Sequence, residues 1–250
     1  MGIIGGQLGY QILRALSPGQ PSGMGGGAYV NRSKLEVLLG PKIWDGTRDK
    51  VVIDFGCGAG GEAIELAQHG ARHVYGVDIS GRLLAAARQR AERESCKNVT
   101  FSATAPELAD VIISVDAFEH FADPGAILKI MAGMLKPTGY IITSFGPTWY
   151  HPRGGHVFSV FPWAHLIFTE SALCRWRSHI RNDGATKFAE VEGGLNQMTI
   201  RRFEQLVAGS PLKIDTLEAV PIRATRLLHN SMTREFFTAI VRCKLRMAAS

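Results

Sequence analysis

The chain has 250 residues, of which 46% are hydrophobic and 20% are charged, and its formal net charge at pH 7 is +6. This length is enough to bury a full core in one domain that carries a moderate insertion. No run reaches the roughly eighteen apolar residues of a membrane span, and the N-terminus lacks the basic start of a signal peptide. The 4 cysteines show neither paired nor zinc-ligand spacing, so we expect a soluble, cytoplasmic protein with reduced thiols and no membrane span.

The positive charge is spread over many separate positions in the C-terminal part of the chain. A nucleic-acid-binding surface would concentrate it as a stripe with interleaved aromatic residues. Only Arg175-Trp176-Arg177 has that local pattern. A solvated surface explains the charge better, and we do not expect nucleic acid as a partner.

Residues 1–32 are rich in glycine around one short apolar segment at residues 10–16. Such a composition favours flexible or loosely docked structure, so we expect a flexible N-terminal segment over residues 1–32. Ser33 is then a suitable N-cap for a short helix over residues 33–39. The folded domain is expected to cover residues 33–250.

Residues 51–79 hold the pattern around which the chain is organised. An apolar, β-branched run at residues 51–53 precedes a glycine loop at residues 56–61, and residues 62–69 then repeat with helical period. A second apolar run ends in Asp78, so the stretch predicts a β-α-β unit with an acidic residue at the tip of its second strand. Glycines let the backbone approach a ligand that the first N–H groups of the helix also face. We therefore expect a nucleotide-like ligand here.

Two kinds of nucleotide cofactor fit this glycine loop. Gly56, Gly58 and Gly61 have the G-x-G-x-x-G spacing of NAD- or FAD-binding proteins, and Asp78 lies at the expected distance beyond them. Asp54 argues against a dinucleotide, because a carboxylate at the tip of the first strand would repel a pyrophosphate. The same carboxylate would favour a ligand with an ammonium and a sulfonium group, which indicates S-adenosylmethionine.

The loop resembles the first motif of the class I S-adenosylmethionine-dependent methyltransferases. Residues 54–60 (DFGCGAG) are similar to that motif, and Val77-Asp78 is similar to the family's ribose-binding strand end. The resemblance implies that Asp54 faces the amino end of the cofactor and Asp78 its ribose hydroxyls. Thr104 stands where the family often has an acidic residue that binds the adenine amine. The implied cofactor site consists of Asp54, Gly56, Cys57, Gly58, Gly60, Asp78, Ile79, Thr104, Ala105 and Asp116.

The resemblance also implies the fold, which is an α/β, Rossmann-like seven-stranded sheet flanked by helices. The strand order would be 3-2-1-4-5-7-6, with the seventh strand antiparallel. Apolar runs and helical periods supply matching elements along the rest of the chain. We expect strands over residues 99–102, 110–115, 140–144, 212–220 and 236–246, helices over residues 81–93, 126–135 and 199–208, and a turn over residues 136–139.

The fourth strand should deliver residues 116–120 (DAFEH) to the carboxyl edge of the sheet, where ligands bind in open α/β folds. With Asp123-Pro124, this run is similar to the fourth motif of small-molecule methyltransferases. The Asn/Asp-Pro-Pro-aromatic motif of nucleobase amino-methyltransferases is absent. His120 could act as a general base or could anchor the loop by hydrogen bonding, and the sequence leaves both roles open.

Residues 146–196 are far longer than an ordinary connection between a strand and its returning helix. The segment is rich in aromatic residues and histidines, and we expect it to be a lid or acceptor-binding insertion for a small apolar or aromatic molecule. His151 and His156 join His120 as candidate catalytic residues. The histidine spacings match no common metal-ligand pattern, so no metal is expected. Contact in a homodimer is the alternative use of exposed aromatic residues in this segment.

These patterns predict a methyltransferase that uses S-adenosylmethionine to methylate a small, apolar or aromatic molecule. Because the sulfonium is already activated, such an enzyme mainly aligns the acceptor, excludes water and removes or tolerates one proton. Two alternatives stay open, namely an NAD-dependent oxidoreductase and a non-catalytic S-adenosylmethionine-binding or scaffold protein. The acceptor molecule and the type of atom that is methylated also stay open.

Overall fold

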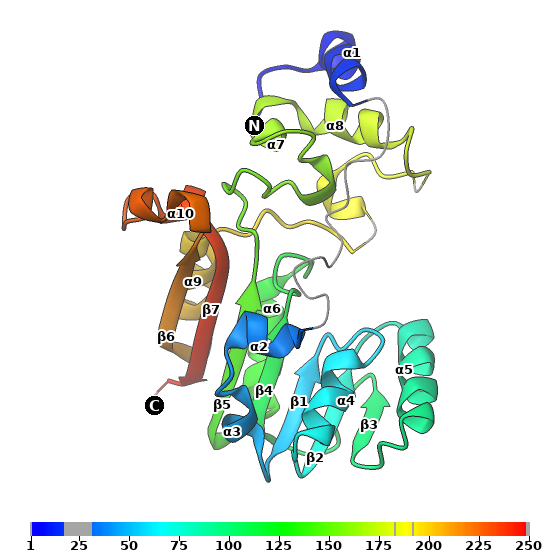
Figure 1. Ribbon diagram of the computed structural model, residues 1–250, viewed down its shortest axis with the longest axis vertical. Coiled ribbons are helices and arrows are strands. Elements are labelled where there is room, and N and C mark those ends of the chain that lie inside the picture. The colour runs from blue at the N-terminus through cyan, green and yellow to red at the C-terminus, as the bar shows by residue number, and fades with distance from the viewer. Residues whose placement is uncertain (1, 18–31, 183, 192, 249–250) are drawn as a thin grey trace.

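A computed structural model describes residues 2–17, 32–182, 184–191 and 193–248. Its lower part is a seven-stranded sheet of order β3-β2-β1-β4-β5-β7-β6 (Figure 1). The first five strands pair in parallel, and β7 runs antiparallel to both β5 and β6. This order and this direction of the last strand confirm the predicted fold. The strands are β1 (Val51–Phe55), β2 (His73–Val77), β3 (Val99–Ser102), β4 (Ala109–Val115), β5 (Leu135–Phe145), β6 (Leu212–Pro221) and β7 (Thr238–Met247).

Helices cover both faces of the sheet. Alternate residues of a strand point to opposite faces, and in β1 Ile53 joins the core on one face while Val52 joins the core on the other. Because both faces are covered, the central strands β1 and β4 carry runs of consecutive apolar residues rather than an alternating pattern. The helices on the Val52 face are α2 (Lys34–Leu39), α3 (Ile43–Thr47), α4 (Gly61–Gln68) and α5 (Gly81–Arg93), and those on the Ile53 face are α6 (Pro124–Gly133) and α9 (Ile200–Ala208).

Local capping signals fix several of these helices. Ser33 accepts a hydrogen bond from the backbone N–H of Glu36 and begins α2, and Ser80 accepts one from Leu83 and begins α5. Both caps were predicted from the sequence. Two expectations were wrong. The turn expected over residues 136–139 lies inside β5, and β7 begins only at Thr238 because the short helix α10 (Arg234–Phe237) precedes it.

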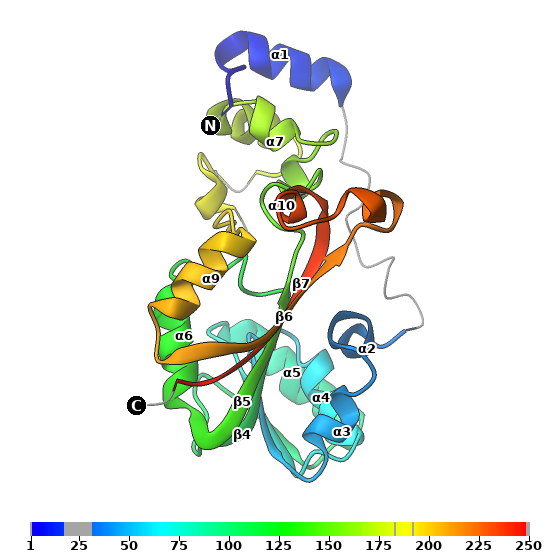
Figure 2. The same cartoon turned by 90° about the vertical axis from the view of Figure 1, so that its left-hand side faces the viewer.

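A second body of structure stands above the carboxyl ends of the parallel strands (Figures 1 and 2). It combines the insertion at residues 146–196 with the N-terminal helix, which packs against α8 at the top of the molecule (Figure 1). We call this body the upper lobe. Its elements are α1 (Gly6–Leu16), η2 (His156–Phe158), α7 (Ala164–Ile167), α8 (Glu170–Arg177) and η3 (Phe188–Glu190).

The N-terminal helix is fixed to the insertion by several contacts. Leu13 of α1 is fully buried in the apolar cluster of the upper lobe. The indole N–H of Trp176 donates to the carbonyl of Ser17 at 2.9 Å, and a parallel bridge joins Ile4 to Phe168. Residues 6–16 of the segment that was expected to be flexible form a helix that packs against α8. Residues 18–31, which belong to the same expectation, lie outside the described residues.

The aromatic residues of the insertion form the core of this upper lobe. Trp149, Phe158 and Phe168 are all at least 97% buried, with exposed fractions of 3%, 0% and 2%. They therefore hold the lobe together, and only the less buried aromatic side chains are available to an acceptor.

None of the helices in the described ranges combines the length and the apolar character that crossing a membrane requires.

Candidate active site

The glycine loop after β1 is held by its own backbone. The N–H groups of Gly56 and Cys57 donate to the carbonyl of Val77 at 2.8 and 3.1 Å, which ties the loop to the end of β2. Gly60 has a positive φ of +79°, and a Cβ atom there would lie 2.6 Å from the ring of Phe101. Only glycine fits this position. Around Gly58, which also has a positive φ, no heavy atom lies within 4 Å of a built Cβ, so the loop is open to a ligand on that side.

Asp78 braces this loop from the end of β2. Its Oδ2 accepts a hydrogen bond from the N–H of Gly58 at 3.0 Å, and its Oδ1 accepts one from the N–H of Ser80 at 2.8 Å. Carboxylate oxygens can accept more than one hydrogen bond each, so both remain able to meet ribose hydroxyls. The next residue, Ile79, is fully exposed.

The loop after β3 holds the two residues expected near adenine. Thr104 is exposed and Ala105 is half-buried. The Ser102 hydroxyl donates to the carbonyl of Thr104, which fixes the turn at the end of the strand. Neither residue supplies a carboxylate, so an adenine amine would have to be bound here by a hydroxyl or by the backbone.

Asp54 lies one residue before the end of β1 and is only 2% exposed. Its Oδ2 has no hydrogen-bond partner. Burial, reinforced by the nearby Glu62 carboxylate, raises the pKa of Asp54 to about 8. From the sequence alone we expect a fixed negative charge at Asp54. With this pKa the carboxyl group mostly keeps its proton at pH 7 as long as no ligand cation is bound next to it.

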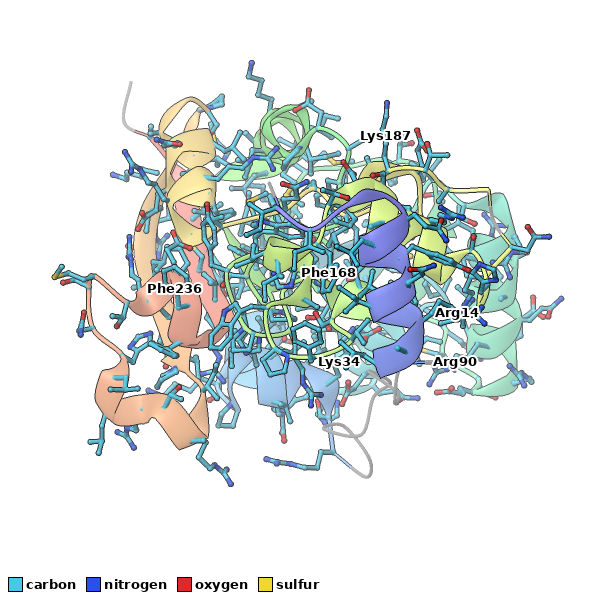
Figure 3. The ribbon with its side chains drawn as sticks, turned by 90° about the horizontal axis from the view of Figure 1, so that it is seen from above. Arg14, Lys34, Arg90, Phe168, Lys187 and Phe236 are labelled. Atoms are coloured by element: carbon cyan, nitrogen blue, oxygen red, sulfur yellow. The ribbon has the colours of Figure 1, made fainter. Side chains whose placement is uncertain are left out.

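A lysine that the sequence analysis did not single out lies among the acidic residues of this edge. Lys34, at the start of α2 and labelled in Figure 3, has its Nζ 3.2 Å from Asp116 and 3.3 Å from Glu62. Asp116 has a positive φ of +49°, a strained conformation for a residue with a side chain. Burial raises the pKa of Asp116 although Lys34 opposes the shift. The edge thus gathers the carboxyl groups of Asp54, Glu62 and Asp116 around one internal ammonium group.

Cys57 contributes backbone rather than chemistry to the loop. Its side chain is 4% exposed, and burial strongly raises the pKa of its thiol. A thiol with a raised pKa is a poor nucleophile at neutral pH. The position therefore selects a small, buried side chain.

The segment after β4 places His120 between the sheet and the insertion. Its Nδ1 lies 2.8 Å from the carbonyl oxygen of Gly194, near the end of the insertion. Because a carbonyl only accepts, Nδ1 must carry the hydrogen, and in the neutral ring Nε2 is left as the basic nitrogen. The preceding residue, Glu119, is buried, and its Oε1 accepts a hydrogen bond from Gly146 at 3.2 Å. Burial, with Asp116 nearby, raises the pKa of Glu119 to about 8.

The insertion brings a second histidine to this point. The ring of His156 lies 5.6 Å from that of His120, measured between centroids, and the rings meet edge to face. The Nε2 of His156 is buried without a hydrogen-bond partner. Burial, with His120 nearby, lowers the pKa of His156 to about 4. At neutral pH this ring is uncharged.

The remaining histidines of the insertion have a different environment. The Nδ1 of His151 accepts a hydrogen bond from the backbone N–H of Arg153 at 2.9 Å, and burial lowers the pKa of His151 to about 4. His165 is buried and bonds the carbonyl of Trp149 at 2.6 Å, so it serves the core of the upper lobe. Across the part of the chain that the structure describes, no three His, Cys, Asp or Glu side chains come together as metal ligands.

Sequence comparison identifies relatives for this arrangement. A family described as a methyltransferase domain matches residues 47–152. The ubiquinone biosynthesis O-methyltransferase of Coxiella burnetii is 33% identical over 168 residues, which cover 58% of this chain and 67% of that protein. The enzyme of the same name from Neisseria meningitidis is 31% identical over 105 residues, covering 39% of this chain and 44% of the relative. The chain thus spans less than half of some of the curated relatives that it matches.

Solved structures share the fold at low sequence identity. An S-adenosylmethionine-dependent methyltransferase from Clostridium acetobutylicum has a TM-score of 0.56 and 13% identity, with 84% of this chain and 89% of that chain covered. Magnesium protoporphyrin IX methyltransferase from Synechocystis, solved with bound S-adenosylhomocysteine, has a TM-score of 0.52 and 20% identity, with 82% and 78% covered. These relationships do not favour an NAD-dependent oxidoreductase. The chain belongs to the S-adenosylmethionine-dependent methyltransferase family, whose cofactor is S-adenosylmethionine.

Proposed function

We propose that the chain transfers a methyl group from S-adenosylmethionine to a hydroxyl group of a small, apolar or aromatic molecule. The observation that carries this proposal is the hydrogen bond from His120 Nδ1 to the carbonyl of Gly194. It leaves a basic Nε2 at the carboxyl edge of the sheet, where a hydroxyl group could lose its proton. The relatives named O-methyltransferase support oxygen as the atom that is methylated.

The residues of the carboxyl edge fit the cofactor. When bound, S-adenosylmethionine supplies a methyl group on a positively charged sulfur. The unpartnered Oδ2 of Asp54 is suited to an ammonium group, since a cation would satisfy the buried oxygen and favour its ionised form. The open space beside Gly58 admits the ligand close to the backbone, whereas Gly60 makes room for Phe101, and Asp78 is suited to the ribose hydroxyls.

His120 is proposed as the general base. A hydroxyl acceptor must give up a proton as its oxygen gains the methyl group, and a positioned base accelerates this typically by a hundredfold or more. His156 is proposed to lie beside it as an uncharged, largely buried ring. This ring could accept a hydrogen bond from the hydroxyl group of the methyl acceptor. His151 is retained as a weaker candidate, because its Nδ1 is already used by the backbone of Arg153.

The upper lobe is proposed to form the acceptor side of the site. The insertion at residues 146–196 leaves the carboxyl end of β5 and stands over the sheet edge, and α1 packs against it from above (Figure 1). Its buried aromatic core makes it a firm cover that can exclude water from the reaction. In this division residues 33–250 form the methyltransferase domain, with residues 146–196 as its acceptor-binding insertion.

Two measurements test the proposal. Calorimetry should detect binding of S-adenosylhomocysteine and no binding of NAD. Incubation with S-adenosylmethionine and a matched set of a phenol, a catechol, an aniline and a thiophenol should release S-adenosylhomocysteine with the hydroxylated compounds. Cofactor binding with no turnover on any acceptor would favour a non-catalytic S-adenosylmethionine-binding or scaffold protein. Preferred methylation of the aniline nitrogen or the thiophenol sulfur would contradict the assignment of a hydroxyl acceptor.

A further inference from the structure

The segment that joins β6 to β7 exposes large apolar side chains. In residues 222–237, which we call the β6–β7 loop, Leu227 is 101% exposed, Met232 88%, Leu228 56% and Phe236 40%. The loop, built from η4 (Arg223–Leu228) and α10, projects from one side of the molecule and faces the viewer in Figure 2. Figure 3 shows Phe236 on the opposite side of the molecule from Arg90 of α5. Four large apolar side chains exposed within sixteen residues point to an interaction surface.

The loop is a firmly held structure. The N–H of Ile222 donates to the carbonyl of Phe237 at 2.8 Å, which closes the base of the loop. At the tip, Asn230 Oδ1 accepts hydrogen bonds from the N–H groups of Met232 and Thr233 at 2.9 and 3.2 Å. The apolar side chains are therefore presented by a fixed backbone, and their exposure is not that of a loose tail.

The charged side chains that this loop exposes to solvent are basic. Arg223 and Arg226 are exposed, and neither has an ion-pair partner among the residues that the structure describes. Residues 222–234 contain no Asp or Glu. The next acidic residue, Glu235, points inward, where its carboxylate accepts hydrogen bonds from the backbone N–H groups of Ile200 and Arg201 at 3.0 and 2.8 Å. The surface thus combines exposed aliphatic groups with unpaired arginines.

We propose that the β6–β7 loop docks on the surface of an anionic lipid bilayer. Aliphatic side chains can enter the acyl boundary while arginines meet anionic headgroups. Residues 222–237 contain neither Trp nor Tyr, the two aromatic residue types that most often serve as hot spots of specific protein interfaces. The single sign of the exposed charge also matches a negatively charged sheet of headgroups better than a protein surface of mixed charge.

The same loop touches the acceptor side of the proposed site. The ring of Phe236 lies 5.4 Å from that of Tyr150 in the insertion, and the hydroxyl of Thr148 donates to the carbonyl of Glu235 at 3.1 Å. The α10 end of the docking surface therefore contacts the start of the insertion. This docking surface does not depend on the proposed function and can be tested without turnover.

The test is co-sedimentation of the full chain with two kinds of vesicle. One kind is phosphatidylcholine with about 30% of the anionic lipid phosphatidylglycerol, and the other is phosphatidylcholine alone. The wild-type chain should sediment with the anionic vesicles and be released by high salt. Leu227→Asp combined with Leu228→Asp should weaken binding tenfold or more. Arg223→Gln combined with Arg226→Gln should weaken binding to the anionic vesicles by about fivefold for each arginine charge that is removed. Binding to the phosphatidylcholine vesicles should not change.

A matched control separates this loop from the other exposed apolar side chains. Leu8→Asp combined with Leu16→Asp changes two exposed positions of α1, which are 65% and 59% exposed, and should leave sedimentation unchanged. Each variant is compared with wild type for S-adenosylhomocysteine binding, so that misfolded variants are recognised. The proposal is wrong if the wild-type chain ignores anionic vesicles, or if the α1 variant loses binding while the loop variants keep it. It is equally wrong if the loop variants abolish only a dimer seen by size-exclusion chromatography.

Discussion

His120 and His156 meet edge to face, with ring centroids 5.6 Å apart, although one follows β4 and the other belongs to the insertion. The contact joins the sheet to the upper lobe at the carboxyl edge. The two rings differ in hydrogen bonding, since His120 donates from Nδ1 to Gly194 while His156 has a buried Nε2 without a partner. One histidine thus has a defined basic nitrogen, and the other lies in a dry environment that keeps its ring neutral.

The first prediction concerns His120. Replacing it by Ala should lower turnover of a hydroxyl acceptor by roughly a hundredfold or more, because a positioned general base typically contributes that much. Affinity for S-adenosylhomocysteine should stay within about twofold, since the side chain bonds to the insertion and not to the glycine loop. The matched control is His73→Ala, at the start of β2, which should keep normal turnover. Normal turnover in the His120 variant would show that this residue only anchors its loop by hydrogen bonding and is not the general base.

The second prediction ranks the histidines of the insertion. His156→Ala should reduce turnover more than His151→Ala, because only the ring of His156 contacts His120, whereas His151 Nδ1 is engaged by Arg153. Neither variant should change the affinity for S-adenosylhomocysteine much. Steady-state kinetics at saturating cofactor, with calorimetry on the same preparations, measures both quantities. A collapse of cofactor affinity with normal residual turnover would place the insertion in the cofactor site and contradict the proposed division of the chain.

The third prediction concerns Asp78. Its replacement by Ala removes two hydrogen bonds to the backbone, from Gly58 and Ser80, as well as the proposed bonds to the ribose. Hydrogen bonds to a charged group contribute roughly 1.5 to 3 kcal/mol each, so cofactor affinity should fall by at least tenfold. Asp78→Asn keeps one acceptor oxygen and should lose less. The control is Asp215→Ala on the exposed side of β6, and calorimetry showing unchanged affinity for Asp78→Ala would remove the ribose assignment.

Much of the sheet could be predicted because its signals are local. The apolar runs, the caps Ser33 and Ser80 and the glycine loop define β1, α2 and α5 within one or two residues of the observed bounds. Two features depend on distant partners and could not be predicted in this way. The extension of β5 back to Leu135 rests on pairing with Ala109 in β4, and the order of α1 rests on docking against α8.

In the candidate site too, features set by a local motif could be predicted and features set by distant residues could not. The backbone of the glycine loop and the position of Asp78 follow from a local motif, and the structure brings them together. The ion pairs of Lys34 with Glu62 and Asp116 join three separate segments, so no spacing in the sequence indicates them. The protonation of Asp54 is set mainly by its burial, and a sequence motif carries no measure of burial. The aromatic residues of the insertion were predicted to meet an acceptor, but Trp149, Phe158 and Phe168 are buried in the core of the upper lobe together with Leu13 of α1.

The last prediction uses the raised pKa of Asp54. At about 8, this pKa lies far above the ordinary value for an aspartate near 3.9, because burial disfavours the charged carboxylate. An ammonium group beside it reverses the preference, so cofactor binding should release a proton. Affinity for S-adenosylhomocysteine should therefore rise as pH increases from about 6 to 8, by up to tenfold per pH unit for one proton released.

Asp54→Asn provides the control for this pH dependence, because an amide has no proton to release. The variant should bind S-adenosylhomocysteine more weakly and with a flatter dependence on pH, while adenosine, which has no amino acid part, should bind nearly as it does to wild type. Without ligand the sign is opposite. The folded state holds a proton that the unfolded chain gives up near pH 4, so Asp54 contributes stability below that pH which is lost as pH rises toward about 8. Calorimetry and thermal unfolding at matched pH values measure the two effects, and a ligand affinity that falls between pH 6 and 8 in wild type would contradict the assignment of Asp54 to the ammonium group.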